Sequence, residues 1–587
     1  MKNTNEKKLL LGNAAVARGL YEAGCSYVSS YPGTPSTEIT EYAAEYPEIY
    51  AEWATNEKVA FETALGAAIA GARSFTAMKH VGLNVAADPL FTASYTGVNG
   101  GFVIGVADDP GMHSSQNEQD SRHYAIAAKL PMLEPSDSEE CKEFAKAAFE
   151  LSEQFDTPVL LRLCTRVAHS QSIVNLCERA DDTLKPYEKN PAKYIMNPFN
   201  AIKKHPVVEK RMADIEELAN TSSLNKVEDN GGKVGVITSG ASYQYAKERF
   251  GNSVSYLKLG LVNPLPKKLI VDFCKKYSNI IVIEELDGII EEQCKALGIA
   301  CDGKNKLSIL GEFSQEVLRR DIKLADYGIE SESDAMPEKT PFTVSVPVRP
   351  AVMCPGCPHR GLFYTLKTLN LTVLGDIGCY TLGGAAPLTA LDTTICMGAS
   401  VSALHGFNKV RPETANKTVA VIGDSTFMHS GITGLVDIVY NKSVSTVLIL
   451  DNHITGMTGH QQNPCTGLTL KNEPTTAISI EAVCHGVGIK RVRTVDPYDL
   501  KACKEAIKEE LAADEPSAII VRRPCALLKT VKRNPPIKVD TDKCRGCKAC
   551  MKIGCPAISF ADGKAKIDSS LCNGCGLCKQ LCAFGAI

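Results

Sequence analysis

Hydrophobic and polar positions alternate along the chain in blocks that predict buried strands separated by helices. Short apolar runs such as GFVIGVA (101–107) and PVLLRL (158–163) are typical of strands. Longer stretches of helical character, such as NEKVAFETALGAAIAGA (56–72), lie between them. This alternation predicts an α/β fold of parallel, doubly wound sheets covered by helices.

The same pattern divides the chain into three α/β domains and a short tail. The second domain begins at KVGVITSGAS, and the third contains the strands TVAVIGD and TVLILDN. Polar, Pro-containing stretches separate the domains. The expected boundaries are 1–190 for the first domain, 191–232 for a connector, 233–327 for the second domain, 328–350 for a linker, 351–533 for the third domain and 534–587 for the tail.

Composition narrows the classes of function. The net charge is −3 and no apolar run is long enough to span a bilayer, so we expect neither a nucleic-acid nor a membrane partner. The charged N-terminus lacks the apolar core of a signal peptide, which predicts a cytoplasmic protein. The 23 cysteines then indicate metal or redox chemistry rather than disulfides. An anaerobic host organism is also expected.

The α+β tail has two cysteine runs with the spacing of iron–sulfur ligands. The first run is Cys544, Cys547, Cys550 and Cys555, and the second is Cys572, Cys575, Cys578 and Cys582. The tail resembles bacterial two-cluster ferredoxins, with four residues (MKIG) before Cys555 where three are usual and Ala583 where a proline is usual. The resemblance implies two 4Fe–4S clusters with exchanged fourth ligands, one held by Cys544, Cys547, Cys550 and Cys582 and the other by Cys572, Cys575, Cys578 and Cys555. Zinc is the alternative metal for such sites.

The third α/β domain has polar residues at the ends of two successive predicted strands. One strand ends at Gly423-Asp424, a helix follows, and the next strand ends at Asp451-Asn452. Strand ends of this kind meet at one edge of a parallel sheet, where ligands bind. Carboxylate and amide oxygens there suit Mg²⁺, and the small Gly423 and Ser425 allow phosphate to approach.

This pattern resembles the diphosphate-binding motif of thiamin diphosphate enzymes. Ser425 stands where that motif has glycine, and Asp451 where it has asparagine. The resemblance implies that Asp424, Asn452 and the carbonyl of Ile454 hold Mg²⁺. The alternative is an ordinary turn of an α/β domain.

The first domain supplies candidates for catalysis. The stretch from Asn56 to Asn84 resembles the pyrimidine-binding domain of 2-oxoacid:ferredoxin oxidoreductases, which implies that Glu57 activates thiamin. The stretch YPGTPSTEI resembles a substrate-binding motif of the same family, which implies that Thr34 faces the substrate carboxylate, with Arg122 as the candidate arginine. The alternatives are a solvated Glu57, a turn at Thr34 and a structural salt bridge at Arg122.

The stretch CPGCPHR opens the third domain where related oxidoreductases have CPGCGH. The resemblance implies a third 4Fe–4S cluster close to thiamin, with His359 facing the cofactor. Its ligands would be Cys354, Cys357, Cys379 and Cys525, with Cys465 as a competing fourth ligand. The alternative is a Pro-Gly turn whose cysteines are merely buried.

The order of these motifs resembles the large (α) subunits of indolepyruvate:ferredoxin oxidoreductases. This resemblance implies oxidative decarboxylation of aryl-2-oxoacids with coenzyme A, a transketolase C-terminal-like second domain, a small β subunit as partner, ferredoxin as electron acceptor and a dimer of αβ units. Three alternatives remain: a pyruvate or 2-oxoglutarate oxidoreductase, a non-redox thiamin decarboxylase or ligase, and a pure electron-transfer protein.

Overall fold

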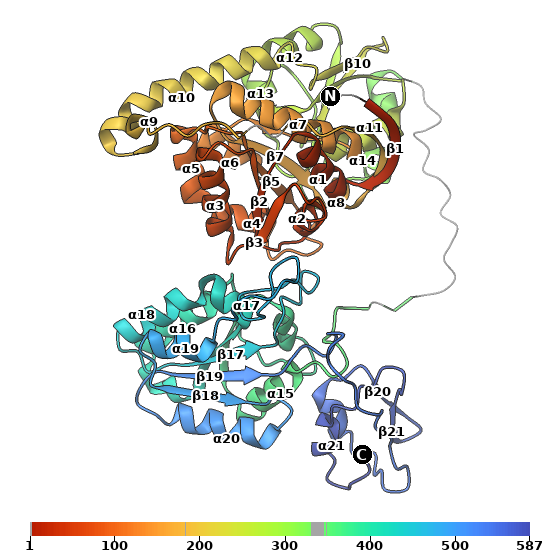
Figure 1. Ribbon diagram of the computed structural model, residues 1–587. Helices are drawn as coiled ribbons and strands as arrows, with labels where there is room; N and C mark the ends of the chain where they lie inside the picture. The colour runs from red at the N-terminus through yellow and green to blue at the C-terminus, as the bar shows by residue number, and fades with distance from the viewer. Residues whose placement is uncertain (1–2, 182–183, 330–345, 348) are drawn as a thin grey trace. The chain divides into compact units, whose positions relative to one another are not determined.

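A computed structural model describes residues 3–181, 184–329, 346–347 and 349–587. It forms two compact units, Met1–Phe342 and Thr343–Ile587 (Figure 1). Most of the predicted linker at 328–350 lies outside the described residues. No helix of the described chain is long and apolar enough to cross a membrane.

The first unit contains a seven-stranded sheet that is parallel except at one edge. Its order is β12 (Leu261–Asn263), β6 (Met132–Leu133), β7 (Val159–Cys164), β5 (Phe102–Asp108), β4 (Ser74–Lys79), β2 (Tyr27–Ser30) and β3 (Tyr50–Trp53). Every residue of β4, β5 and β7 is buried. This is the expected consequence of helices on both faces of a parallel sheet.

Helices cover this sheet and fix its strand ends. On one side, α1 (Gly12–Glu22) packs against α7 (Ser138–Phe155), which is capped by the Asp137 side chain accepting from the Glu140 N–H. On the other side, α3 (Glu57–Ile69) packs over the sheet, with Phe61 edge-to-face on Phe102. Asn56 caps α3, so the helix begins at Glu57, just after β3.

A second sheet in the first unit has the order β13 (Asn279–Ile283), β10 (Val234–Ser239), β11 (Ser255–Leu259) and β9 (Lys226–Glu228). Only β9 runs antiparallel. Between β11 and β13 the chain adds one strand to the first sheet, where β12 pairs antiparallel with β6. The segment predicted as a separate domain therefore contributes a strand to the sheet of the first domain.

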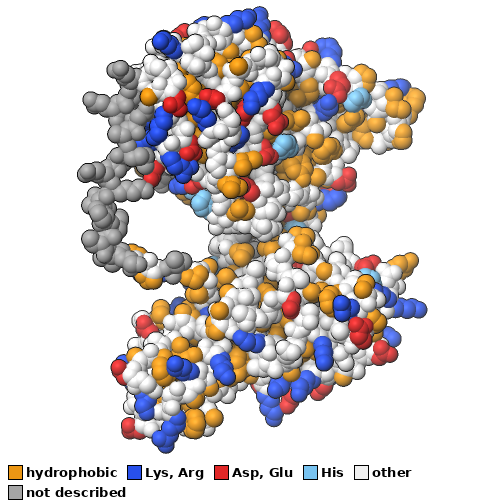
Figure 2. Space-filling model, turned by 180° about the vertical axis from the view of Figure 1, so that it is seen from behind, with side chains coloured by type: hydrophobic (Ala, Val, Ile, Leu, Met, Phe, Trp, Pro, Cys, Tyr) orange, Lys and Arg blue, Asp and Glu red, His pale blue; other side chains and the backbone are white. Residues whose placement is uncertain are grey.

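An arm that comprises residues 184–219, with α9 (Pro191–Tyr194) and α10 (Pro198–Ala219), exposes large apolar side chains (Figure 2, right). They are Leu184, Tyr187, Ile195, Phe199, Ile202 and Val207, each more than half exposed. A concentration of this kind is typical of a protein–protein contact surface.

The second unit is built on a six-stranded parallel sheet. Its order is β15 (Thr393–Thr394), β14 (Thr372–Gly375), β16 (Thr418–Gly423), β17 (Thr446–Asp451), β19 (Ser517–Arg522) and β18 (Arg491–Val495). Alternate residues of β16 face opposite layers: Val419 and Val421 pack towards α15 (His359–Leu369) and α20 (Leu500–Leu511). Ala420 and Ile422 pack towards α16 (Ala399–Val410) and α18 (Ile432–Tyr440), so the sheet is doubly wound, as predicted.

The tail is a small α+β domain beside α15 (Figure 1). The hairpin of β20 (Ile558–Ala561) and β21 (Lys564–Ile567) covers two short helical turns, η6 (Ala549–Ile553) and α21 (Leu577–Gln580). The predicted fold class, α/β domains followed by a ferredoxin-like domain, is confirmed.

Candidate functional site

The carboxyl ends of β16 and β17 bring two acidic side chains together in the second unit. Asp424 is buried, and its Oδ1 accepts from the Ser425 N–H at 2.8 Å. Its Oδ2 is also buried and has no hydrogen-bond partner in the described part of the chain. Burial and the neighbouring Asp451 raise the pKa of Asp424 to about 8. A buried carboxylate oxygen without a donor is what a cation ligand requires, so this set fits Mg²⁺.

Asn452 lies in the loop directly after β17. Its Oδ1 accepts from the Ile454 N–H at 3.1 Å, which turns the loop back towards β16. Thr455 follows in this loop and donates to Ser425 Oγ at 2.9 Å. Asp451 forms an ion pair with Arg522, at 2.6 Å between Oδ2 and Nε. The strand-end residues predicted from sequence therefore form one cluster, with Asp451 bound to the protein itself.

His359, the first residue of α15, faces this cluster. Its Nε2 lies 3.5 Å from Asn452 Nδ2, and its ring meets Tyr380 edge-on at 5.9 Å between centroids. Burial lowers the pKa of His359 to about 4, so the ring is neutral at pH 7. A Cβ at Gly423 would lie 2.7 Å from Tyr380, so only glycine fits the strand end here.

The cysteines of CPGC lie beside two others from distant parts of the sequence. Burial and the neighbouring Cys354 and Cys379 raise the pKa of Cys357 to about 12. Burial, with Cys525 and Cys354, raises that of Cys379 to about 11. Cys379 follows β14 and Cys525 follows β19, so both stand at the carboxyl edge of the sheet. By contrast, the charged neighbours of Cys465 are Asp424, Asp451, Arg522 and Glu481.

The tail encloses two cavities, each lined by one of the cysteine sets expected from the ferredoxin resemblance. The four cysteines on the first cavity are Cys544, Cys547, Cys550 and Cys582, and those on the second are Cys555, Cys572, Cys575 and Cys578. Backbone amides donate to two of the sulfurs: Ala586 to Cys582 at 3.3 Å and Ile537 to Cys572 at 3.5 Å. Such bonds stabilise negative charge on cluster thiolates.

In the first unit, further candidates stand at the carboxyl ends of parallel strands. Glu57 is buried, and a Cβ at Gly82 would lie 2.7 Å from its Oε1, so Gly82 leaves room for the carboxylate. Thr34 is half-buried in the loop after β2. A Cβ at the neighbouring Gly33 would lie 3.4 Å from the Lys79 side chain. Lys79 is the last residue of β4, and burial lowers its pKa.

Arg122 is fully buried in the first unit, in a network of ion pairs. Its guanidinium binds Asp120 at 2.6 Å and pairs with Glu284. It also donates to the carbonyls of Glu285 and Asp287 at 3.0 and 2.9 Å. These ion pairs join the two sheets of the unit. A structural salt bridge at Arg122 was the alternative that the sequence left open.

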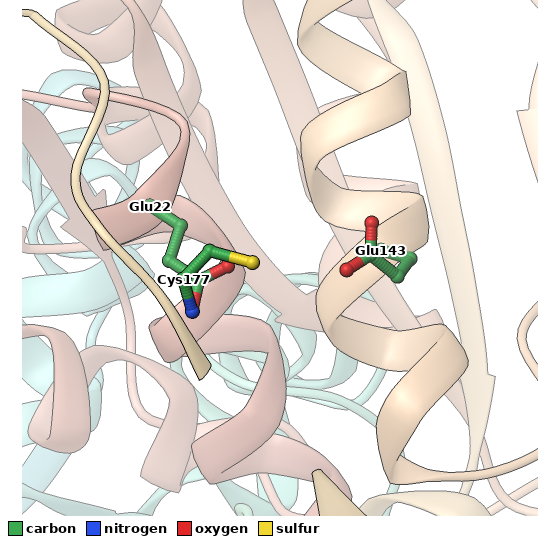
Figure 3. A group of neighbouring side chains, drawn as sticks. All are labelled: Glu22, Glu143 and Cys177. Carbon is green, nitrogen blue, oxygen red and sulfur yellow. The ribbon is translucent and has the colours of Figure 1, made fainter. Parts of the chain in front are cut away.

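Glu22, Glu143 and Cys177 form a compact group whose ligand atoms lie within 4.8 Å of one another (Figure 3). Both carboxylates are already paired with cations: Arg18 and Lys146 bind Glu22, and Lys142 and Lys146 bind Glu143. The group is therefore part of a largely buried network of ion pairs, and a metal ion would have to displace its cations.

Two buried groups near the site were missed in the sequence. Asp376, directly after β14, accepts from the backbone N–H groups of Ile377, Gly398 and Ser400 at 2.8–3.0 Å. Asp376 directly follows a strand, and the same pattern led us to predict Asp424 as a site residue. Arg360 lies within the quoted motif CPGCPHR, but no spacing rule gives a basic residue there a role.

Models of three protein families match the chain. They are "Pyruvate flavodoxin/ferredoxin oxidoreductase, thiamine diP-bdg" at 18–230, "Thiamine pyrophosphate enzyme, C-terminal TPP binding domain" at 376–521 and "4Fe-4S dicluster domain" at 536–583. The chain thus carries thiamin diphosphate-binding domains and a 4Fe–4S dicluster domain.

Full-length relatives decide the family. "Indolepyruvate oxidoreductase subunit IorA" of Archaeoglobus fulgidus is 41% identical over 95% of this chain and 93% of its own. The protein of the same name in Thermococcus kodakarensis is 42% identical, over 99% and 97%. The chain belongs to the IorA family.

The chain also has more distant relatives. "2-Oxoglutarate synthase subunit KorA" of Archaeoglobus fulgidus is 24% identical over 51% of this chain and 95% of its own. The solved 2-oxoglutarate:ferredoxin oxidoreductase of Magnetococcus marinus covers 54% of this chain and 64% of its own, at 20% identity and a TM-score of 0.45. As an IorA family member with thiamin and iron–sulfur domains, the chain is an oxidoreductase subunit.

Proposed function

We propose that this chain oxidatively decarboxylates aryl-2-oxoacids with coenzyme A and passes the electrons to ferredoxin. The observation that carries the proposal is the buried Asp424, whose unpaired Oδ2 stands at the strand ends of a thiamin-binding domain. The same compact unit holds two cysteine-lined cavities for clusters. Relatives named for indolepyruvate support the aryl substrate.

Each part of the site has a separate task in this proposal. Bound thiamin diphosphate supplies the carbanion chemistry that decarboxylation of a 2-oxoacid needs. Glu57 holds a proton against the aminopyrimidine ring and so activates the cofactor. Asp424, Asn452 and the Ile454 carbonyl bind Mg²⁺, which neutralises the diphosphate, while Gly423 and Ser425 lie against the phosphates. His359, kept neutral by burial, orients Asn452.

Substrate binding is assigned to the first unit. Thr34, in the loop after β2, is proposed to donate to the substrate carboxylate. The ion pairs of Arg122 with Asp120 and Glu284 support a positioning role, in which Arg122 fixes the second sheet against the first.

The grouping of the CPGC cysteines supports a third 4Fe–4S cluster, held by Cys354, Cys357, Cys379 and Cys525. We predict roughly 12 iron atoms per chain, as three cubanes require. Cys379→Ser and Cys525→Ser should each reduce iron towards about eight. Cys484→Ala, a buried cysteine on the far layer of the same sheet, is the matched control and should leave iron unchanged. About eight iron atoms in the wild-type chain, or loss of iron from Cys465→Ser but not Cys525→Ser, would contradict this ligand set.

The remaining partners follow from the family. Relatives carry the word "subunit" in their names, which supports a small β subunit, and the exposed apolar arm at α9–α10 offers a face for such a contact. Ferredoxin as external acceptor, coenzyme A as acyl acceptor and a dimer of αβ units complete the proposal.

The substrate class is tested with a panel of 2-oxoacids on enzyme co-expressed anaerobically with a small partner subunit. Reduction of a viologen dye is measured with indolepyruvate, phenylpyruvate, pyruvate and 2-oxoglutarate, each with coenzyme A. We expect kcat/KM to be at least about tenfold higher for the aryl substrates, because an aryl pocket gains apolar contact that pyruvate lacks. Faster turnover of pyruvate or 2-oxoglutarate would assign the chain to that other class.

A further inference from the structure

Arg360 is a buried cation between the CPGC loop and the tail domain. It is only 3% exposed and lies in the first turn of α15. Its Nε donates to the Cys354 carbonyl at 3.2 Å, and its NH2 group donates to that of Met353. Its NH1 group donates across to the tail, to the carbonyls of Ile553 and Gly554. The Arg360 guanidinium therefore donates hydrogen bonds both to the CPGC loop and to the tail, and we call this contact between loop and tail the junction.

No carboxylate of the described residues forms an ion pair with Arg360; its acceptors are all backbone carbonyls. A buried charge without a counter-charge is unfavourable. The free-energy cost of burying this charge is higher here, because the positive end of the α15 dipole lies at the same turn. The groups that surround the guanidinium are thiols, those of Cys555, Cys357, Cys354 and Cys575. Arg360 also lines the second tail cavity.

The junction itself is tightly fitted. Gly356 has φ +66°, and a Cβ there would lie 1.8 Å from Asn573 Nδ2, so the CPGC loop and the tail touch through a glycine. Tyr498 donates from its hydroxyl to the Gly356 carbonyl, and Asn573 approaches the Pro355 carbonyl at 3.5 Å. Asn573 lies between Cys572 and Cys575 in the sequence, so the second cavity is directly adjacent to the loop.

We infer that Arg360 is the counter-charge of the cluster held by Cys555, Cys572, Cys575 and Cys578, and that it raises the reduction potential of this cluster above that of its neighbour in the tail. The inference rests on the cluster assignment of the proposed function. With four thiolates, the cluster carries a charge of −2 when oxidised. The cluster would accept one of the electrons released as the substrate is oxidised, without a proton, and would then carry a charge of −3. A fixed positive charge favours the more negative state.

This role makes Arg360 a positioning residue for electron transfer. Electrons that leave the proposed cluster of the CPGC cysteines would then reach the second tail cavity first. The cluster of Cys544, Cys547, Cys550 and Cys582 lies beyond it in the tail. That outer cavity is lined by Arg545 and Lys548, and both of these residues are exposed. Water screens exposed charges, so the outer cluster gains less from them.

The test is a redox titration of the complete, cluster-loaded complex, followed by EPR, for Arg360→Gln and Arg360→Lys. Arg360→Gln should make one tail cluster harder to reduce at unchanged iron content, by at least tenfold in its reduction equilibrium, which is about 59 mV for one electron. Arg360→Lys keeps the charge and should retain most of the potential. Arg545→Gln is the matched control and should leave this cluster within threefold of wild type.

The outcomes separate this inference from the proposed function. Unchanged potentials in Arg360→Gln, in an enzyme that holds its clusters and turns over, overturn the role of Arg360 alone. Loss of the cluster from Arg360→Gln but not from Arg360→Lys supports the counter-charge, whereas equal loss from both overturns it in favour of a packing role. Absence of tail clusters from the wild-type enzyme contradicts the proposed function itself.

Discussion

Asp424→Asn is expected to lose at least about 100-fold in activity and to bind thiamin diphosphate and Mg²⁺ weakly. The substitution keeps the size of the side chain and the oxygen that accepts from the Ser425 N–H, but it removes the charge. The buried Oδ2 of Asp424 has no hydrogen-bond partner among the described residues, so it is free to bind the cation. Without the negative charge, the cation loses this ligand. Cofactor affinity is measured by calorimetry, and activity by dye reduction.

Asp437→Asn is the matched control, because Asp437 lies on the exposed side of α18 and should bind cofactor as wild type does. Wild-type cofactor affinity in Asp424→Asn would show that the metal is held elsewhere.

Because the pKa of Asp424 is raised, binding of the cation should release a proton. Since its pKa is about 8 in the metal-free protein, the carboxyl is mostly protonated at pH 7 and must release its proton when the cation binds. Cofactor affinity should therefore rise between about pH 6 and pH 8 and level off above. Calorimetry in buffers of different ionisation enthalpy should detect the released proton in the wild-type chain and not in Asp424→Asn.

Glu57→Gln is expected to bind the cofactor within a few-fold of wild type but to lose about 10²- to 10⁴-fold in kcat. Glutamine fits the same space beside Gly82 but does not take part in the proton transfer that activates thiamin. Exchange of the thiazolium C2 proton of the bound cofactor, followed by NMR after quenching, should slow in parallel. The control is Glu62→Gln on the exposed face of the same helix, where Glu62 only pairs with Lys58. A kcat within threefold of wild type would remove Glu57 from the mechanism.

The site residues that could be predicted from the sequence are those that follow short-range patterns, such as a polar residue directly after a strand or a fixed cysteine spacing. Asp424 and Asn452 follow apolar strands directly, and parallel topology brings such strand ends to one edge. The tail cysteines follow a spacing that a tight loop around a cluster requires, and the structure gathers the same sets around two cavities.

Other features depend on contacts between distant residues, which local patterns do not encode. Arg122 and Glu284 are 162 positions apart in the sequence, so their ion pair can be seen only in the folded structure. Arg360 meets Ile553 across 193 positions, which is why the motif CPGCPHR gave the cysteines and the histidine a role but not the arginine. The return of β12 to the first sheet is equally non-local, because Leu261 pairs with Leu133.

Oxidative decarboxylation by this chain is tested by the stoichiometry of a single reaction of the purified complex under anaerobic conditions. Arylpyruvate and coenzyme A are supplied, and CO₂, acyl-coenzyme A and reduced viologen are counted together. We expect one acyl-coenzyme A and two electrons for each CO₂, and no reaction after thiamin diphosphate and Mg²⁺ are removed. Release of CO₂ with an aldehyde product and no dye reduction would contradict it, because the chain would then be a non-redox decarboxylase.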